Sequence, residues 1–192
     1  MEFRIKRVFV EGEPTRCYHL YNQQEKLILV ADHNTPWLPE DSHHQVRFAR
    51  ADGELVASLD LPWQADEHKH GMTFTRHAII LDHAVYAILT MYWDSEAPDK
   101  RPYLVIEVED HHWFVKCCHP DGHDYAIYED VPTNLTIVDE LLEEELPPVV
   151  GFLNAEENGR EFDLSLPGNV IQKTAVIALA LLFLLDRRQK ER

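Results

Sequence analysis

The chain contains few cysteines and few basic side chains for its length. Its 192 residues include 3 cysteines, two of them adjacent, and this odd number argues against a disulfide framework. Lys and Arg number 18 against 34 Asp and Glu, which gives a formal net charge of −16. Because phosphates repel such a chain and no cluster of Lys and Arg interrupts the acidity, nucleic acid is not expected as a partner.

The sequence also lacks the signatures of nucleotide-binding folds and of membrane spans. Neither a GxGxxG motif nor a P-loop occurs, and strand and helix patterns do not alternate. The longest apolar run, 175–185, is far shorter than the ~20 residues of a transmembrane helix, so we expect no transmembrane span. The first residues, MEFRIKRVFV, do not read as a signal peptide, and we therefore expect a cytoplasmic protein.

What the sequence does contain is a series of short strand patterns separated by turn residues. Asp-Gly or Asn-Gly pairs, which favour tight hairpins because both residues tolerate positive φ, occur at 52–53, 121–122 and 158–159. Polar tips predict further hairpins at 23–25, at 82–83 and near 110. About ten to twelve short strands at this spacing are typical of a β-sandwich or a β-barrel.

Only one segment upstream of the C-terminus has helical spacing. Residues 134–146 (NLTIVDELLEEEL) place apolar side chains on one helical face, with Asn134 as a cap and Pro147 and Pro148 at the end. No low-complexity linker interrupts the chain, and residues 1–192 are predicted to form a single domain.

The C-terminal stretch from Asn169 to Leu185 predicts a helix buried inside the protein. Every residue from Ala175 to Leu185 is apolar, and a helix that is apolar on all sides must be surrounded by other elements. Positions 169–187 would span about 28 Å as a helix, close to the height of a small barrel. We therefore expect a β-barrel wrapped around its own C-terminal helix, with 175–185 inaccessible to solvent.

Residues 162–186, FDLSLPGNVIQKTAVIALALLFLLD, carry a resemblance to a known family. An alternating strand, a short turn and an apolar helix ending in Leu185-Asp186 make the chain similar to the tubby C-terminal-like superfamily, which includes tubby proteins, phospholipid scramblases and LURP-one-related proteins. The resemblance implies a closed antiparallel β-barrel of about 12 strands around a buried C-terminal helix at about 169–187. It also implies a non-enzymatic binding or scaffold protein whose partner is a lipid or another protein.

A cluster of histidines and cysteines at 111–124 supports an alternative function, metal binding. It contains His111, His112, Cys117, Cys118, His119 and His123. Zinc takes three or four nitrogen or sulfur ligands, and the candidate ligands are Cys117, His119 and His123, with hydrolytic chemistry as one option. The other interpretation is that the cysteines pack as small apolar side chains while the histidines lie exposed near a hairpin tip.

The buried-helix hypothesis predicts the outcome of a truncation. A chain that ends at Thr174 loses the whole apolar run and should fail to fold, because the strands then have nothing to close around. Circular dichroism and thermal unfolding of the truncated chain provide the measurement. A truncated protein that stays soluble and unfolds cooperatively would contradict the hypothesis.

Overall fold

The computed structural model describes residues 1–8, 17–32, 43–62, 66–67, 72–94, 102–118, 124–129, 147–156 and 159–190. Most of these residues are in β-strands, with one helix at the C-terminus. The first strands are β1 (Glu2–Val8), β2 (Cys17–Asn22), β3 (Leu27–Asp32), β4 (His43–Ala49), β5 (Leu55–Pro62), β6 (Asp66–Glu67) and β7 (Met72–Leu81). They are followed by β8 (Ala84–Asp94), β9 (Tyr103–Val108), β10 (His111–Cys117), β11 (Tyr125–Glu129), β12 (Val149–Ala155), β13 (Glu161–Ser165) and α1 (Ile171–Lys190).

The strands form one antiparallel sheet that closes on itself. Their order is β5-β4-β3-β2-β1-β13-β12-β11-β10-β9-β8-β7-β6. Strand β5 also pairs with β7, where Ala57 lies opposite Leu81, so all strands except the two-residue β6 make a closed ring. The fold class predicted from the sequence, a closed antiparallel barrel of about 12 strands, is confirmed.

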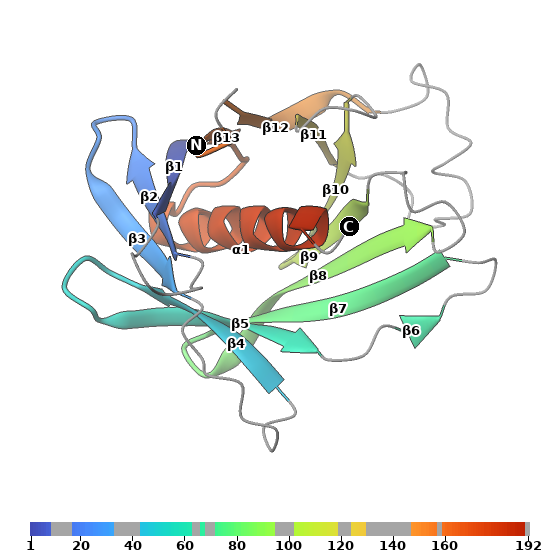
Figure 1. Ribbon diagram of the computed structural model, residues 1–192, viewed down its shortest axis with the longest axis horizontal. Helices are drawn as coiled ribbons and strands as arrows, with labels where there is room; N and C mark the ends of the chain where they lie inside the picture. Colours follow the sequence, from blue (N-terminus) through green and yellow to red (C-terminus); the bar gives the residue numbers. More distant parts are fainter. Residues whose placement is uncertain are drawn as a thin grey trace.

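Helix α1 runs through the inside of this ring (Figure 1). Residues 175–185 are each at most 2% exposed, which confirms that this run is inaccessible to solvent. The helix begins at Ile171 instead of Asn169 and continues to Lys190, beyond the predicted end at 187. Within the described part of the chain, no helix has both the length and the apolar character that crossing a membrane requires.

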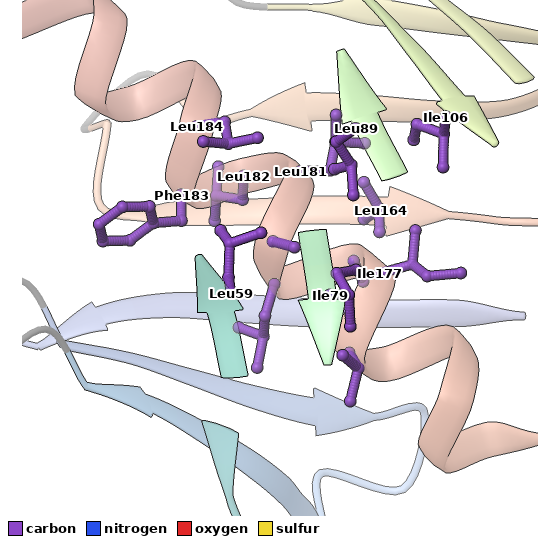
Figure 2. Close-up of a cluster of buried hydrophobic side chains, with 14 of the residues drawn as sticks. Leu59, Ile79, Leu89, Ile106, Leu164, Ile177, Leu181, Leu182, Phe183 and Leu184 are labelled. Atoms are coloured by element: carbon purple, nitrogen blue, oxygen red, sulfur yellow. The ribbon is translucent and has the colours of Figure 1, made fainter. Parts of the chain in front are cut away.

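The core consists of the inward-facing side chains of the strands packed against every face of the helix. Successive side chains of a strand point to opposite faces, so each strand contributes one inward row. Figure 2 shows the contact between Leu59, Ile79, Leu89, Ile106 and Leu164 of the barrel and Ile177, Leu181, Leu182, Phe183 and Leu184 of α1. Burial of each large apolar side chain contributes about 1.5–3 kcal/mol, so the helix supplies much of the stabilisation of the whole domain.

Several predicted hairpins are present. The tips at 23–25, 52–53, 82–83 and 109–110 each connect two paired strands. Gly53 has φ +87°, and Asp82 and His83 have φ +51° and +64°, the left-handed conformation that tight hairpins require. Strands β12 and β13 also pair as predicted, with Gly159 at φ +62°. The pair at 121–122, Asn158 and the predicted helix at 134–146 lie outside the described residues.

A buried carboxylate holds the C-terminal part of the helix in the barrel. Asp186 is 4% exposed and accepts hydrogen bonds from Arg7 Nη2 on β1 and from the Tyr18 hydroxyl on β2. The Tyr18 ring also meets Phe183 edge-on at 6.2 Å. A negative charge close to the C-terminal end of a helix is opposed by the helix dipole, so the guanidinium of Arg7 is needed to compensate it.

We expect Asp186→Asn to lower the free energy of unfolding by about 3 kcal/mol, because it leaves the guanidinium of Arg7 without its counter-ion in a largely buried position. The matched control is Asp163→Asn, which breaks an exposed ion pair with Arg4 and should cost less than about 1 kcal/mol. Urea denaturation of both variants measures the difference. Equal effects of the two substitutions would show that the buried pair does not anchor the helix.

Candidate functional site

Because α1 and the inward side chains fill the barrel, the recesses among the described residues lie on its outer face and at one of its ends. A groove of about 700 Å³ lies on the outside of β1, β2, β12 and β13. Two recesses of about 380 Å³ each lie at the end of the barrel where α1 begins. These three recesses are the candidate ligand sites among the described residues. The charge and polarity of the side chains that line each recess indicate which of them could bind a ligand.

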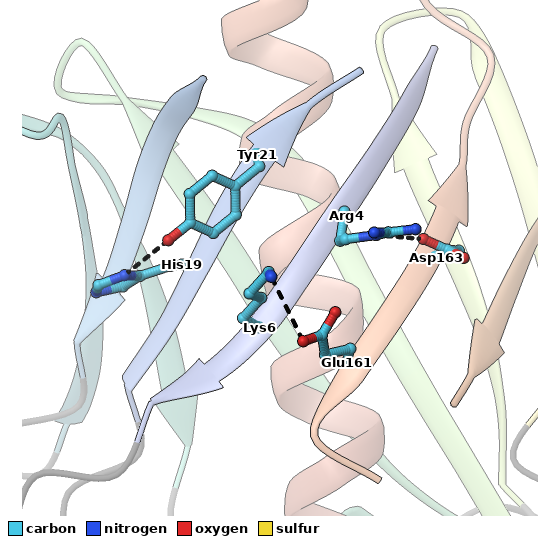
Figure 3. Close-up of polar contacts among 6 residues, drawn as sticks. All are labelled: Arg4, Lys6, His19, Tyr21, Glu161 and Asp163. Atoms are coloured by element: carbon cyan, nitrogen blue, oxygen red, sulfur yellow. Dashed lines mark hydrogen bonds and ion pairs between the residues drawn. The ribbon is translucent and has the colours of Figure 1, made fainter. Parts of the chain in front are cut away.

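The two basic side chains that line the outer groove are already paired with carboxylates (Figure 3). Arg4 Nε lies 3.2 Å from Asp163 Oδ1, and Lys6 Nζ lies 3.4 Å from Glu161 Oε1; in each pair the two residues are direct partners in the β1–β13 register. Such exposed pairs mainly fix the register and contribute less than about 1 kcal/mol each. Their cations are therefore engaged, and the groove is not a free basic patch.

Next to the groove, a histidine and a tyrosine complete the polar surface shown in Figure 3. The Tyr21 hydroxyl lies 3.4 Å from His19 Nδ1, and Lys6 Nζ lies 5.8 Å from the centre of the Tyr21 ring. Burial lowers the pKa of His19 below its usual value. Near neutral pH this histidine is therefore mostly uncharged, and it adds no positive charge to the groove.

The end of the barrel where α1 begins has a different character, and we call it the open mouth. The hairpin tips at 23–25, 52–53, 82–83 and 109–110 and the loop 166–170 surround the first turn of α1. In Figure 1 the tips of the β2–β3 and β4–β5 hairpins lie at the left, the side on which α1 starts. Hydrogen bonds from Arg50 to Gln172 (3.1 Å) and from Lys173 to Glu109 (3.0 Å) connect the tips to the helix.

One recess of the open mouth, which we call the mouth pocket, lies between the start of α1 and the ends of β8–β11. Lys173 Nζ is 5.0 Å from the centre of the Tyr86 ring, and its hydrogen bond with Glu109 raises the pKa of the ammonium group. Burial, aided by the charge of Glu109, raises the pKa of the Tyr86 hydroxyl. His111 Nδ1 lies 2.7 Å from Glu129 Oε1. The pocket thus combines aromatic walls with a lysine that is already paired with a carboxylate.

The inner wall of the mouth pocket contains a polar atom without a hydrogen bond. Trp113 is 5% exposed, and its indole nitrogen has no partner among the residues that the structure describes. Buried donors are normally satisfied by protein atoms or by water, and an unpaired one costs about 1–3 kcal/mol. A ligand atom that accepts a hydrogen bond from this indole N–H would therefore remove the cost of the unpaired donor.

The second recess lies on the other side of the start of α1. It is lined by Met1, Phe3, the β2–β3 tip, Ser165 and Ile171. The loop that leads into the helix is packed tightly, because a Cβ atom on Gly168 would lie only 2.3 Å from the Thr174 hydroxyl oxygen. The first turn of α1 is therefore held in place between two recesses.

Large apolar side chains remain exposed around this mouth. Except for Phe152 on the outer groove, the exposed large apolar residues of the described chain lie here: Met1, Leu55, Val85, Val149, Val170 and Ile171. Val85 is 60% exposed, Leu55 52% and Ile171 44%. Single exposed apolar residues are common on protein surfaces, but a group around one recessed end marks a candidate binding surface.

Register shifts explain why three of these side chains are exposed. Leu55, Val85 and Val149 would continue the inward rows of β5, β8 and β12 if the alternation were regular. A shift next to each residue instead places it opposite an outward-facing residue of the neighbouring strand, for example Val85 opposite Ile80. An extra residue at a bulge changes the face to which the following side chains point. The bulges therefore turn core-like residues into surface residues.

The candidate zinc ligands lie elsewhere. Cys117 is the last residue of β10, at the end remote from the open mouth, and its half-buried side chain packs against the core. His119 and His123 lie outside the described residues, so the structure does not place the three candidate ligands relative to one another. Among the residues that are described, no group of three or more His, Cys, Asp or Glu side chains is arranged to hold a metal ion.

The open mouth was not predicted from the sequence. One signal was available at the start of the helix, where Gln172 and Lys173 precede the wholly apolar run from Ala175. That change in polarity marks where the helix leaves the barrel. In an antiparallel barrel every second turn lies at the same end. The positions of the four hairpin tips along the chain therefore also indicated that they lie at one end of the barrel.

Comparison of the chain with models of protein families, with curated proteins and with solved structures finds no match. The fold and the open mouth are therefore the basis for inferring a function.

The zinc hypothesis predicts stoichiometric metal in the purified protein, lost when Cys117, His119 and His123 are all replaced by alanine. Elemental analysis of both proteins, purified without chelator, provides the measurement. A chelator should also lower the stability of the unsubstituted protein, because a structural zinc site contributes to folding. A metal-free protein whose stability is unchanged by chelator would exclude the site.

Proposed function

We propose that this chain is a non-enzymatic binding protein of tubby-like fold, located in the cytoplasm, which recognises its partner through the open mouth of the barrel. The observation that carries the proposal is the group of exposed apolar side chains around the recessed start of α1. A monomeric protein rarely leaves such a group uncovered without a use for it.

The filled interior supports this location. Fatty-acid or cofactor binding inside a barrel needs a cavity, and here the axis is occupied by side chains of α1 that are at most 2% exposed from Ala175 to Leu185. A ligand of the described part of the chain is therefore taken at the ends or on the outer face. Among the described residues, only the open mouth combines a recess with several exposed apolar side chains.

The resemblance to the tubby-like superfamily implies either a lipid or a protein partner, and the charges favour a protein. Lipid recognition through anionic head groups needs a cluster of Lys and Arg that is free to bind phosphate. In this chain the net charge is −16, and the cations of the outer groove, Arg4 and Lys6, are each paired with a carboxylate. We therefore expect no binding to phosphoinositide vesicles at physiological salt.

Binding of small apolar probes, followed through the backbone amide signals of the labelled protein, tests the proposal. Indole and benzyl alcohol should shift the amides of Val85, Tyr86, Ile171 and Lys173, since these surround the exposed apolar surface. The variant Ile171→Glu should weaken the shifts severalfold. Its fold should be retained, because the first turn of a helix tolerates a carboxylate.

The matched control is Phe152→Glu, which places the same charge at an exposed apolar position of the outer groove. It should leave the shifts at the open mouth unchanged. If the probes shift only amides of the outer groove, or if Ile171→Glu and Phe152→Glu act equally, the open mouth is not the binding site.

A further inference from the structure

We infer that the partner of the open mouth is a basic amphipathic protein segment, one that places apolar side chains between lysines or arginines. The inference rests on the proposed function, since it names the partner of the same surface. It is carried by the combination of two features that meet at this end of the barrel, exposed apolar residues and acidic hairpin tips.

The apolar part of the surface is formed by residues that are close to one another at the start of α1. Met1 and Ile171 line one recess, and Val170 lines the mouth pocket on the other side of the helix turn. Leu55 follows the hairpin tip at 52–53, and Arg50, which precedes this tip, donates a hydrogen bond to Gln172 of α1. Val85 follows the tip at 82–83. A partner helix laid across the mouth would cover these side chains with its apolar face.

The charged part of the surface is acidic. The hairpin tips contribute six exposed carboxylates, those of Glu25, Asp52, Glu54, Asp82, Glu109 and Asp110. The basic residues are fewer. Arg50 and Lys173 are paired with Glu54 and Glu109, which leaves four of the six carboxylates outside these ion pairs. Carboxylates around an apolar centre favour cations at the edge of the partner, and they speed its association at low salt.

The same charges act against the other surfaces that an exposed apolar patch could meet. An anionic membrane and a nucleic acid both present phosphates, which the carboxylates of the tips repel. A second copy of this chain would bring the same acidic tips face to face, so self-association through this end is opposed as well. A cationic segment is the partner for which attraction and apolar burial act together.

Fluorescence anisotropy of a labelled helical peptide of leucine and lysine tests the inference on the full chain. The peptide should bind, and raising the salt to about 0.5 M should weaken binding. The double variant Val85→Ser and Ile171→Gln removes apolar surface without changing the charge, and it should weaken binding about tenfold. The matched control Phe152→Gln should bind as the unsubstituted protein does.

Charge is tested separately with Asp82→Asn combined with Asp110→Asn. This pair should weaken binding severalfold, whereas Asp163→Asn with Glu161→Gln on the outer face should change it little. A peptide with the same lysines and with serine in place of leucine should bind at least tenfold more weakly, because it offers cations without an apolar face.

Three results would overturn the inference. Equal weakening by the mouth and the outer-face variants would mean that the peptide is held by the overall charge alone. Sedimentation with phosphatidylserine vesicles that depends on Val85 and Ile171 would assign the surface to a membrane. Binding at the mouth by a neutral or acidic amphipathic peptide, but not by the basic one, would refute the partner class while leaving the open mouth as the binding site.

Discussion

The whole structure depends on the need to surround one apolar helix. From Ala175 to Leu185 the helix has no polar side on which water could be tolerated, and each of these residues is at most 2% exposed. Only a closed wall satisfies that condition, and the pairing of β5 with β7 closes it. The strands need the helix equally, because their inward rows would otherwise enclose an empty space, and cavities in a core are costly. Barrel and helix therefore stabilise one another as one unit.

The residues on either side of this apolar run differ in exposure. The residue that follows it is buried and stabilises the fold, whereas exposed residues on its N-terminal side form part of the candidate binding surface. Near the C-terminal end, Asp186 is buried and held by Arg7 and Tyr18, which fixes the helix along and around its axis. At the N-terminal end, Val170 and Ile171 remain exposed between two recesses. A helix that is fixed firmly at one end can present its other end as a rigid surface. Rigidity of that kind lowers the entropic cost of binding a partner.

The fold was more accessible to sequence reasoning than the site. Turn residues such as Asp52-Gly53 and Asp82-His83 act locally, and a run such as 175–185 is decisive by its length alone. The exposed apolar residues of the open mouth have no such local signature. Leu55, Val85 and Val149 fit the alternation of buried rows, and it is the register shift beside each of them that leaves them exposed. Bulges depend on how neighbouring strands accommodate curvature, which is not encoded in a single short segment.

The sequence by itself determined the mostly β character, several hairpins and the burial of the C-terminal helix, because periodicity, turn chemistry and hydrophobicity are properties of contiguous residues. Only the tertiary structure decided which strands close the barrel, that Asp186 meets Arg7 across 179 positions, and that the hairpin tips gather around the start of α1. These contacts join residues far apart in the chain, and their geometry follows from the complete packing of barrel and helix. The candidate site belongs to this second group, since its apolar and acidic residues come from several hairpins and from the start of α1.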